Sequence, residues 1–138
     1  MTQPDSTVRL IRSDALTDTA PYAYAATTTG AARLVFLAGS CPLDAEGATV
    51  APGDIAAQAR QCLTNLTAAL AAADATMRDV IYTRVLVATT AREDLVAAWT
   101  VVHDAFADHE VPSTLQGVTV LGYPDQLVEI EAVAALGL

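Results

Sequence analysis

The sequence predicts a single two-layer α+β domain, in which a mixed β-sheet carries both of its helices on one face. Three observations predict this class: a length of 138 residues, a 53% hydrophobic composition, and an element order of β-β-β-α-β-α-β-β. A chain of this length forms one domain and buries enough surface to fold without a metal or disulfide. We therefore expect one domain over residues 1–138, with one sheet face left bare by its own helices.

Three short strands are expected in the first forty residues. Val8 to Ile11 has the residue types of a first strand. Tyr22 to Thr28 is compatible with a second strand that ends at the turn Thr29-Gly30. Leu34 to Ala38 is a compact apolar segment and forms the third. A loop containing several prolines and glycines then leads to the first helix.

Two amphipathic helices are predicted from apolar residues that recur at helical spacing. The first follows Asp54, a residue type favoured at the N-cap, and extends to Ala73. The second runs from about Arg92 to Ala107. The residues of the first helix that recur at helical spacing are Ile55, Ala59, Cys62, Leu63, Leu66, Ala69, Leu70 and Ala73, with Gln58, Gln61, Thr64 and Asn65 largely between them. The buried stripe expected of the second is Leu95, Ala98, Val102, Ala105 and Phe106.

Three strands are expected in the second half of the chain. Val80 to Val87 is rich in β-branched and aromatic residues and is predicted to be central. Gly117 to Leu121 and Leu127 to Ala135 are predicted as the last two strands. In the final strand Glu129 and Glu131 alternate with apolar residues, so both acids should lie on one face. Two acids on so apolar a strand require water, a partner or a pocket.

The charge balance excludes several classes of function. Sixteen acids against seven bases give a net charge of −9. All the bases are arginine, so a Schiff-base or P-loop lysine is excluded. Nucleic-acid binding begins with a basic footprint, and we expect neither a nucleic-acid nor a membrane partner. We predict a cytoplasmic location, because the N-terminal MTQPDSTVRLIRSD has no apolar signal region and no apolar run is long enough to cross a bilayer.

The cysteines and histidines indicate no metal and no cofactor. Cys41 and Cys62 are isolated thiols without CxxC spacing, and both are interpreted as small buried hydrophobic residues in a reducing compartment. His103 and His109 lie six residues apart and lack metal-ligand spacing. The chain also has no GxSxG motif, so a serine hydrolase has little support.

Five short segments occur in a fixed order and spacing, and together they indicate a family more specifically than any one of them does alone. In this order they resemble the RidA (YjgF-like) family, named for reactive intermediate deaminase activity, and the resemblance extends from about Ala20 to Ala134. The segments are Ala20-Pro21-Tyr22, Phe36 to Gly39 with Pro42-Leu43-Asp44, QARQCLTNL at 58–66, Asp79-Val80, and LVEIEA at 127–132.

The resemblance implies a chorismate-mutase-like fold and a homotrimer with three small-molecule clefts between neighbouring subunits. It implies two catalytic residues: Glu129, which matches the glutamate that holds the attacking water, and Tyr22, which matches the tyrosine that helps close the cleft. Gly39 and Ser40 are then expected at the ligand, with Ser40 in place of a common glutamine.

The arginine that grips the substrate carboxylate in deaminating members has no basic counterpart here. Anchoring the segment on Gly117 and Leu121 places Ser113 at its position, and a shift of one residue places Thr114 there. Trp99 falls near a second-helix asparagine of the family. Each charge-assisted bond to a carboxylate is worth roughly 1.5–3 kcal/mol, whereas a hydroxyl donates one neutral bond. We therefore expect a neutral or apolar ligand, and expect Ser113→Arg to create imino-acid deamination.

Three residues each have two interpretations. Arg84, mid-strand in an apolar segment, either replaces the missing substrate-binding arginine or neutralises Glu131, and the second is favoured because buried charges are usually paired. Trp99 either packs or offers a stacking platform to the ligand, and packing is favoured. Glu129 is either a general base or a structural acid.

Two functions follow from these residues. The first is a RidA-like enzyme that acts on an imine, enamine or related carbonyl compound by water addition or proton transfer, and that is not a standard 2-imino-acid deaminase. The second is a non-catalytic trimer that binds a metabolite or serves as a scaffold.

Overall fold

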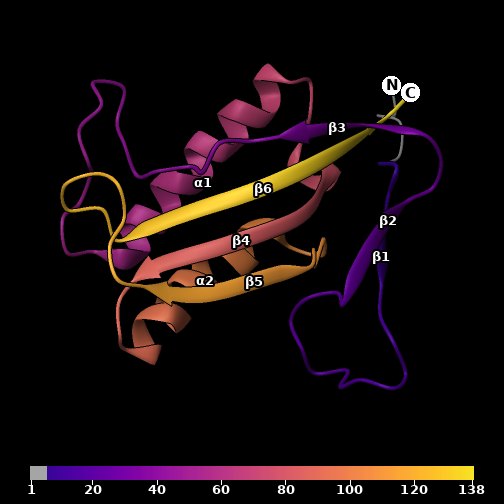
Figure 1. The fold of residues 1–138 in the computed structure, drawn as a ribbon, viewed down its shortest axis with the longest axis horizontal. Helices are drawn as coiled ribbons and strands as arrows, with labels where there is room; N and C mark the ends of the chain where they lie inside the picture. The colour runs from indigo at the N-terminus through magenta and orange to yellow at the C-terminus, as the bar shows by residue number, and fades with distance from the viewer. Residues whose placement is uncertain (1–5) are drawn as a thin grey trace.

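The computed structural model describes residues 6–138, so the first five residues of the predicted domain, and of its N-terminal segment, lie outside the described residues. The predicted order of strands and helices is confirmed, with one additional 3-10 turn (Figure 1). The elements are β1 (Val8–Ile11), β2 (Ala25–Thr28), β3 (Ala32–Phe36), α1 (Ile55–Ala72), η1 (Met77–Asp79), β4 (Val80–Ala88), α2 (Arg92–Phe106), β5 (Ser113–Val118) and β6 (Val128–Gly137).

Four strands form the main sheet in the order β3-β6-β4-β5. β4 is antiparallel to β6 and parallel to β5, and β3 is antiparallel to β6. The sheet is therefore mixed, as predicted, and β4 is one of its two central strands. β1 and β2 pair with each other in a separate two-stranded sheet, which lies beyond the N-terminal end of β5 in Figure 1.

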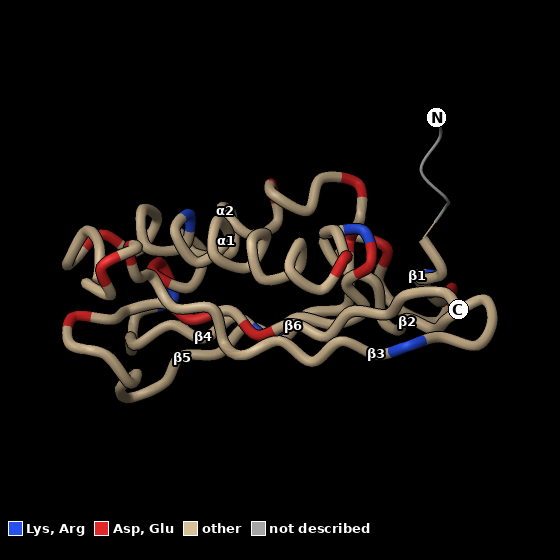
Figure 2. The backbone as a smooth tube through the Cα atoms, turned by 90° about the horizontal axis from the view of Figure 1, so that it is seen from above, with Lys and Arg blue, Asp and Glu red and all other residues tan. Residues whose placement is uncertain are grey.

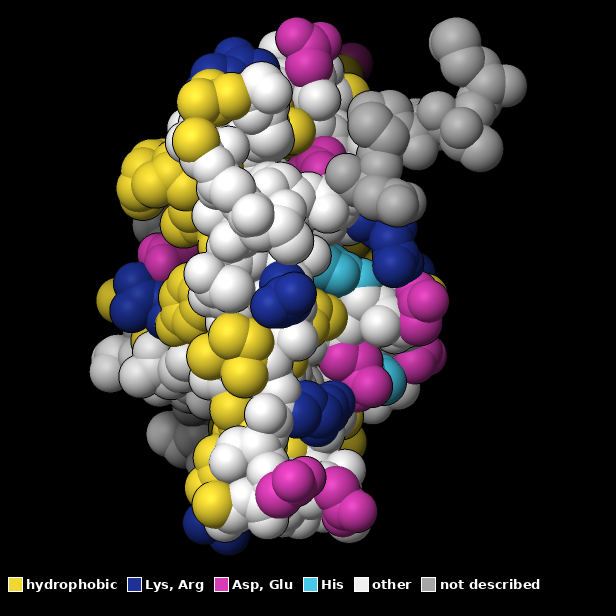
Figure 3. Space-filling view, turned by 90° about the vertical axis from the view of Figure 1, so that its right-hand side faces the viewer, with side chains coloured by type: hydrophobic (Ala, Val, Ile, Leu, Met, Phe, Trp, Pro, Cys, Tyr) yellow, Lys and Arg dark blue, Asp and Glu magenta, His cyan; other side chains and the backbone are white. Residues whose placement is uncertain are grey.

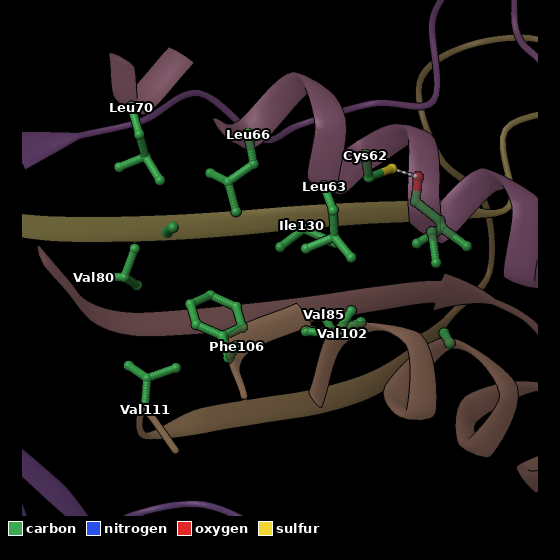
Figure 4. Packing of buried hydrophobic residues seen from close by; sticks show 14 of the residues in the cluster. Cys62, Leu63, Leu66, Leu70, Val80, Val85, Val102, Phe106, Val111 and Ile130 are labelled. Atoms are coloured by element: carbon green, nitrogen blue, oxygen red, sulfur yellow. Dashed lines mark hydrogen bonds between the residues drawn. The ribbon is translucent and has the colours of Figure 1, made fainter. Parts of the chain in front are cut away.

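Both helices cover one face of the main sheet, which confirms the two-layer prediction (Figure 2). The core lies between the layers, where Leu66 and Leu70 of α1 meet Val80, Val85 and Ile130 of the sheet (Figure 4). We call the opposite side of the sheet the open face, and its β3 side chains are strongly exposed. Within the described chain, neither helix is long and apolar enough to span a membrane.

β5 begins earlier than the sequence predicted. It covers Ser113–Val118 rather than Gly117–Leu121, because it pairs with β4 from Thr83, which aligns with Ser113, to Ala88, which aligns with Val118. The apolar residues after Val118 have the composition of a strand but no further residue of β4 with which to pair. The bounds of the other predicted elements agree within three residues.

α1 begins as predicted, with the Asp54 carboxylate accepting a bond from the backbone NH of Ala57 at 3.0 Å. Gln58, one of the polar residues that lie between the apolar positions of α1, has a fully buried side chain. Its Nε2 donates to the carbonyl of Asp125 at 2.9 Å, and its Oε1 accepts from the backbone NH of Leu127 at 2.7 Å. A buried amide needs both kinds of partner, and here it fixes the segment that enters β6.

Candidate functional site

The segment after β3 runs beside β6 and forms one wall of the candidate site. Ser40 exchanges two backbone hydrogen bonds with Ile130, at 2.7 Å from its NH and 3.0 Å to its carbonyl. Ser40 is itself buried. The residues on either side of it, Gly39 and Cys41, both lie against Glu129 of β6.

The carboxylate of Glu129 lies against the backbone of Gly39 and accepts one hydrogen bond, from Cys41. A Cβ on Gly39 would lie 2.7 Å from Cδ and 2.8 Å from Oε2 of Glu129, so only glycine lets the carboxylate rest on this backbone. Cys41 Sγ donates to Oε1 at 3.3 Å. Glu129 is half-buried, and its side chain points to the open face, where Leu86 of β4 is its cross-strand neighbour.

Cys41 acts as a hydrogen-bond donor to Glu129. The pKa of Cys41 is raised to about 11, first by burial and then by the hydrogen bond and negative charge of Glu129, against a smaller opposite effect of Gln126. The thiol therefore stays protonated at neutral pH. The interpretation of Cys41 as a buried hydrophobic residue is wrong, since it is half-buried and bound to an acid. That of Cys62 is confirmed, since it is fully buried and its Sγ points at the Val128 carbonyl (Figure 4).

The contact between Cys41 and Glu129 predicts how fast Cys41 is alkylated. The wild-type thiol should react slowly with iodoacetamide at pH 7 and faster only as the pH approaches its raised pKa. Glu129→Gln removes a negative charge that raises the pKa of Cys41, so the pKa falls and alkylation at pH 9 accelerates. Peptide mass spectrometry measures the rate, and Cys62 in the same sample is the internal control. Equal Cys41 rates in the two proteins would contradict the link.

Arg84 and Glu131 form an ion pair across β4 and β6. Arg84 Nε lies 2.9 Å and Nη2 2.8 Å from the same oxygen, Oε2 of Glu131. The side chains are 44% and 36% exposed, so the pair lies at the surface of the open face rather than in the core. The favoured interpretation of Arg84, that it neutralises Glu131, is confirmed as a contact.

The two candidate hydroxyl residues of β5 lie on opposite faces of the sheet. Ser113 accepts a 2.7 Å bond from Thr83, whose side chain is fully buried on the helix-covered side. Thr114 accepts a 2.9 Å bond from the hydroxyl of Tyr82. Thr114 is also aligned with Arg84 in the β4–β5 ladder, which places it on the open face. Only Thr114 shares a face with Glu129.

A depression of about 360 Å³ lies on this open face. Gly39, Tyr82 and the ion pair of Arg84 with Glu131 line it, together with apolar residues that include Phe36 and Val133. A larger hollow of about 580 Å³ lies near the chain ends, lined by Arg33, Arg78 and other residues. We place the site at the smaller depression, because it adjoins Glu129 through Gly39 and the larger one contains none of the predicted site residues.

Tyr22 and Trp99 lie together but apart from Glu129. Their rings meet edge to face at 6.4 Å, and Trp99 also contacts the ring of His103 on α2 at 5.9 Å. Trp99 packs partly buried against the core, as its favoured interpretation predicts. Among the contacts of residues 6–138, none joins this aromatic group to Glu129. One chain therefore divides the predicted site residues between two places.

Two residues of the site, Tyr82 and Cys41, were not predicted as site residues from the sequence. Tyr82 is two residues before Arg84, so strand alternation alone would place both on one face. Cys41 gives no such signal, because its contact with Glu129 spans 88 residues of sequence. No group of three or more potential metal-ligating side chains occurs in the part of the chain that the structure describes.

Comparison with known proteins relates the whole fold to one family. The family model described as endoribonuclease L-PSP matches residues 12–136. No curated protein matches the sequence significantly.

Three solved structures are similar over nearly the full length. A Rid-family protein of unknown function from Yersinia pestis, YyfB, is 30% identical with a TM-score of 0.85, covering 94% of this chain and 99% of that chain. A member of the YjgF/YER057c/UK114 family from Mycobacterium tuberculosis is 30% identical with a TM-score of 0.63 and the same coverage. The YjgF gene product of E. coli is 26% identical with a TM-score of 0.63, covering 91% of this chain and 97% of that chain.

Proposed function

Because the chain belongs to the endoribonuclease L-PSP family, also described as the Rid or YjgF family, we propose that it is a small-molecule enzyme of that family. It acts on a small imine, enamine or related carbonyl compound, by water addition or proton transfer. The observation that carries this proposal is the carboxylate of Glu129, which rests on Gly39 and is held by Cys41 at the open face. A fixed carboxylate at a ligand site is suited to general-base catalysis.

In the proposed reaction with an imine, Glu129 takes a proton from a water molecule as the oxygen adds to the C=N carbon. The proton passes to nitrogen and gives a carbinolamine; the hydroxyl proton of the carbinolamine then moves to nitrogen, the C–N bond breaks, and the products are ammonia and a carbonyl compound. With an enamine, the same carboxylate takes the proton from nitrogen and returns it to the β-carbon, which gives the imine. Both versions need a proton acceptor with little motion of its own, which the contacts of Gly39 and Cys41 supply.

The polar groups that share the open face with Glu129 favour a neutral substrate. Thr114 accepts a bond from Tyr82, which leaves its own hydroxyl hydrogen to donate to a carbonyl, hydroxyl or imine nitrogen. Arg84 is occupied by Glu131. Thr114, rather than Ser113, is therefore the hydroxyl that we assign to substrate binding.

We further propose that the site is completed by assembly into a homotrimer. The open face exposes Phe36 by 75% and Leu34 by 57%, and apolar area of this kind is normally covered by a partner. A neighbouring chain would bring its own Tyr22 and Trp99 to Glu129, which supports a cleft shared between subunits. The cytoplasmic location expected from the sequence stays a prediction.

RNA cleavage, which the family description names, has little support in this chain. A net charge of −9 opposes binding of a phosphate backbone. Figure 3 shows acidic and basic side chains interspersed on the end of the molecule near the chain termini, rather than a continuous basic surface. Both observations favour a small, uncharged substrate.

The alternative is a non-catalytic trimer that binds a metabolite, and the absence of a cation at Ser113 or Thr114 motivates it. A panel of small imines, enamines and carbonyl compounds separates the two. An enzyme converts a member of the panel and loses turnover with Glu129→Gln, whereas a binder is stabilised by a compound that is recovered unchanged.

A further inference from the structure

We propose that Glu131 determines which ligands the open face accepts: by occupying Arg84, it excludes carboxylates and admits neutral compounds. This inference rests on the proposed function, because it concerns the ligand of the same depression. It assigns a specificity role to an acid that takes no part in the proposed chemistry.

The geometry of the pair limits what Arg84 can offer. Both Nε and Nη2 point to Oε2 of Glu131, at 2.9 and 2.8 Å. This is one of the two edges of the guanidinium through which a ligand carboxylate can form two parallel hydrogen bonds. At the other edge, Nη1 with Nη2, the positive charge is already neutralised by Glu131. No other polar partner of the pair occurs among the described residues. A carboxylate must therefore displace Glu131 before it can engage the same edge.

Arg84 lies where an unpaired guanidinium would contact a ligand bound at Thr114. In the ladder it is aligned with Glu131 on one side and with Thr114 on the other, so the three lie in one row across the sheet. Neighbouring strands are about 4.8 Å apart, which puts the guanidinium within a small molecule's reach of the Thr114 hydroxyl. If Arg84 were unpaired, a ligand bound at Thr114 would meet a cation.

The charges facing the depression add to the exclusion. Arg84 and Glu131 cancel, and Glu129 on the same face leaves one uncompensated negative charge. A carboxylate ligand would approach this charge with no free cation beside it, whereas a carboxamide or ketone would not be repelled. The row therefore selects by charge, although it contains an arginine.

Pyruvate and pyruvamide test the rule, because they differ only in a carboxylate against a neutral carboxamide. Saturation-transfer NMR titrations of the full-length protein give the ratio of their dissociation constants. We expect wild type to prefer pyruvamide. Glu131→Gln should shift the ratio toward pyruvate by about tenfold or more, the gain expected when a charge-assisted bidentate pair becomes available.

Two further variants define the cause. Arg84→Gln in the Glu131→Gln background should abolish the gain, since the cation is then removed. Asp108→Asn is the matched control: it makes the same change of charge at the exposed pair with Arg78, outside the depression, and should leave the ratio unchanged.

An unchanged ratio in folded Glu131→Gln would overturn the proposal, as would an equal gain in Asp108→Asn. Half-exposed ion pairs add little to stability, so the variant should fold. If it does not, the Arg84→Gln/Glu131→Gln double variant still decides. It should keep the wild-type preference, and a tenfold loss of pyruvate binding would mean that Arg84 is already available in the native protein. These experiments measure binding, so their outcome does not depend on whether Glu129 is catalytic.

Discussion

Replacement of Glu129 by glutamine is expected to lower turnover by about 10²–10⁴-fold, the usual contribution of a general base. The amide keeps the size of the side chain and its contact with Gly39, but it cannot accept a proton from water. Product formation at saturating substrate measures the loss. Ligand binding, followed by thermal shift, should be retained, because the variant removes a chemical group and not the depression.

The exposed acid Glu46 supplies the matched control, since Glu46→Gln makes the same change in a loop residue that does not line the depression. Its turnover should equal that of wild type. Full turnover in Glu129→Gln would remove the proposed mechanism. Retained binding with no turnover in wild type would instead favour the non-catalytic trimer.

Thr114→Arg is expected to create 2-imino-acid deamination, with a gain in kcat/KM of about 100-fold or more. The new guanidinium would stand on the open face beside Arg84 and could bind the substrate carboxylate through two charge-assisted bonds. The assay follows formation of the 2-oxo acid from an imino acid generated in solution. A folded Thr114→Arg protein with no gain would show that deamination needs more than the missing cation.

Ser113→Arg, the change suggested by the sequence, is the comparison. Its side chain starts from the helix-covered side, and it removes the acceptor of the bond from buried Thr83. An unsatisfied buried hydroxyl costs about 1–3 kcal/mol, so this variant should unfold at lower denaturant concentration without gaining activity. Deamination by Ser113→Arg and not by Thr114→Arg would reverse our assignment of faces.

The choice between Ser113 and Thr114 depends on a property of strands that the sequence leaves open. A shift of one residue turns every side chain to the other face. Gly117 and Leu121 were natural anchors for the alignment, but the strand pairs through Ser113–Val118. Only the ladder with β4 decides which hydroxyl faces Glu129.

Local patterns predicted the rest of the fold well. Helical spacing gave α1 and α2, and alternation put Glu129 and Glu131 on one face. Local patterns did not predict contacts between segments that are distant in sequence. Gln58 is buried although its type is usually exposed, and nothing in the sequence around Cys41 indicates its hydrogen bond to Glu129. The family resemblance named Glu129 and Tyr22, yet one chain keeps them apart.

The separation of Tyr22 from Glu129 makes assembly the central claim. Sedimentation equilibrium over a range of concentrations measures it without knowledge of the substrate. The account predicts a particle of three times the 14.3 kDa chain mass. A particle of 14.3 kDa at all concentrations would contradict it, because no second chain would then be present to complete the site.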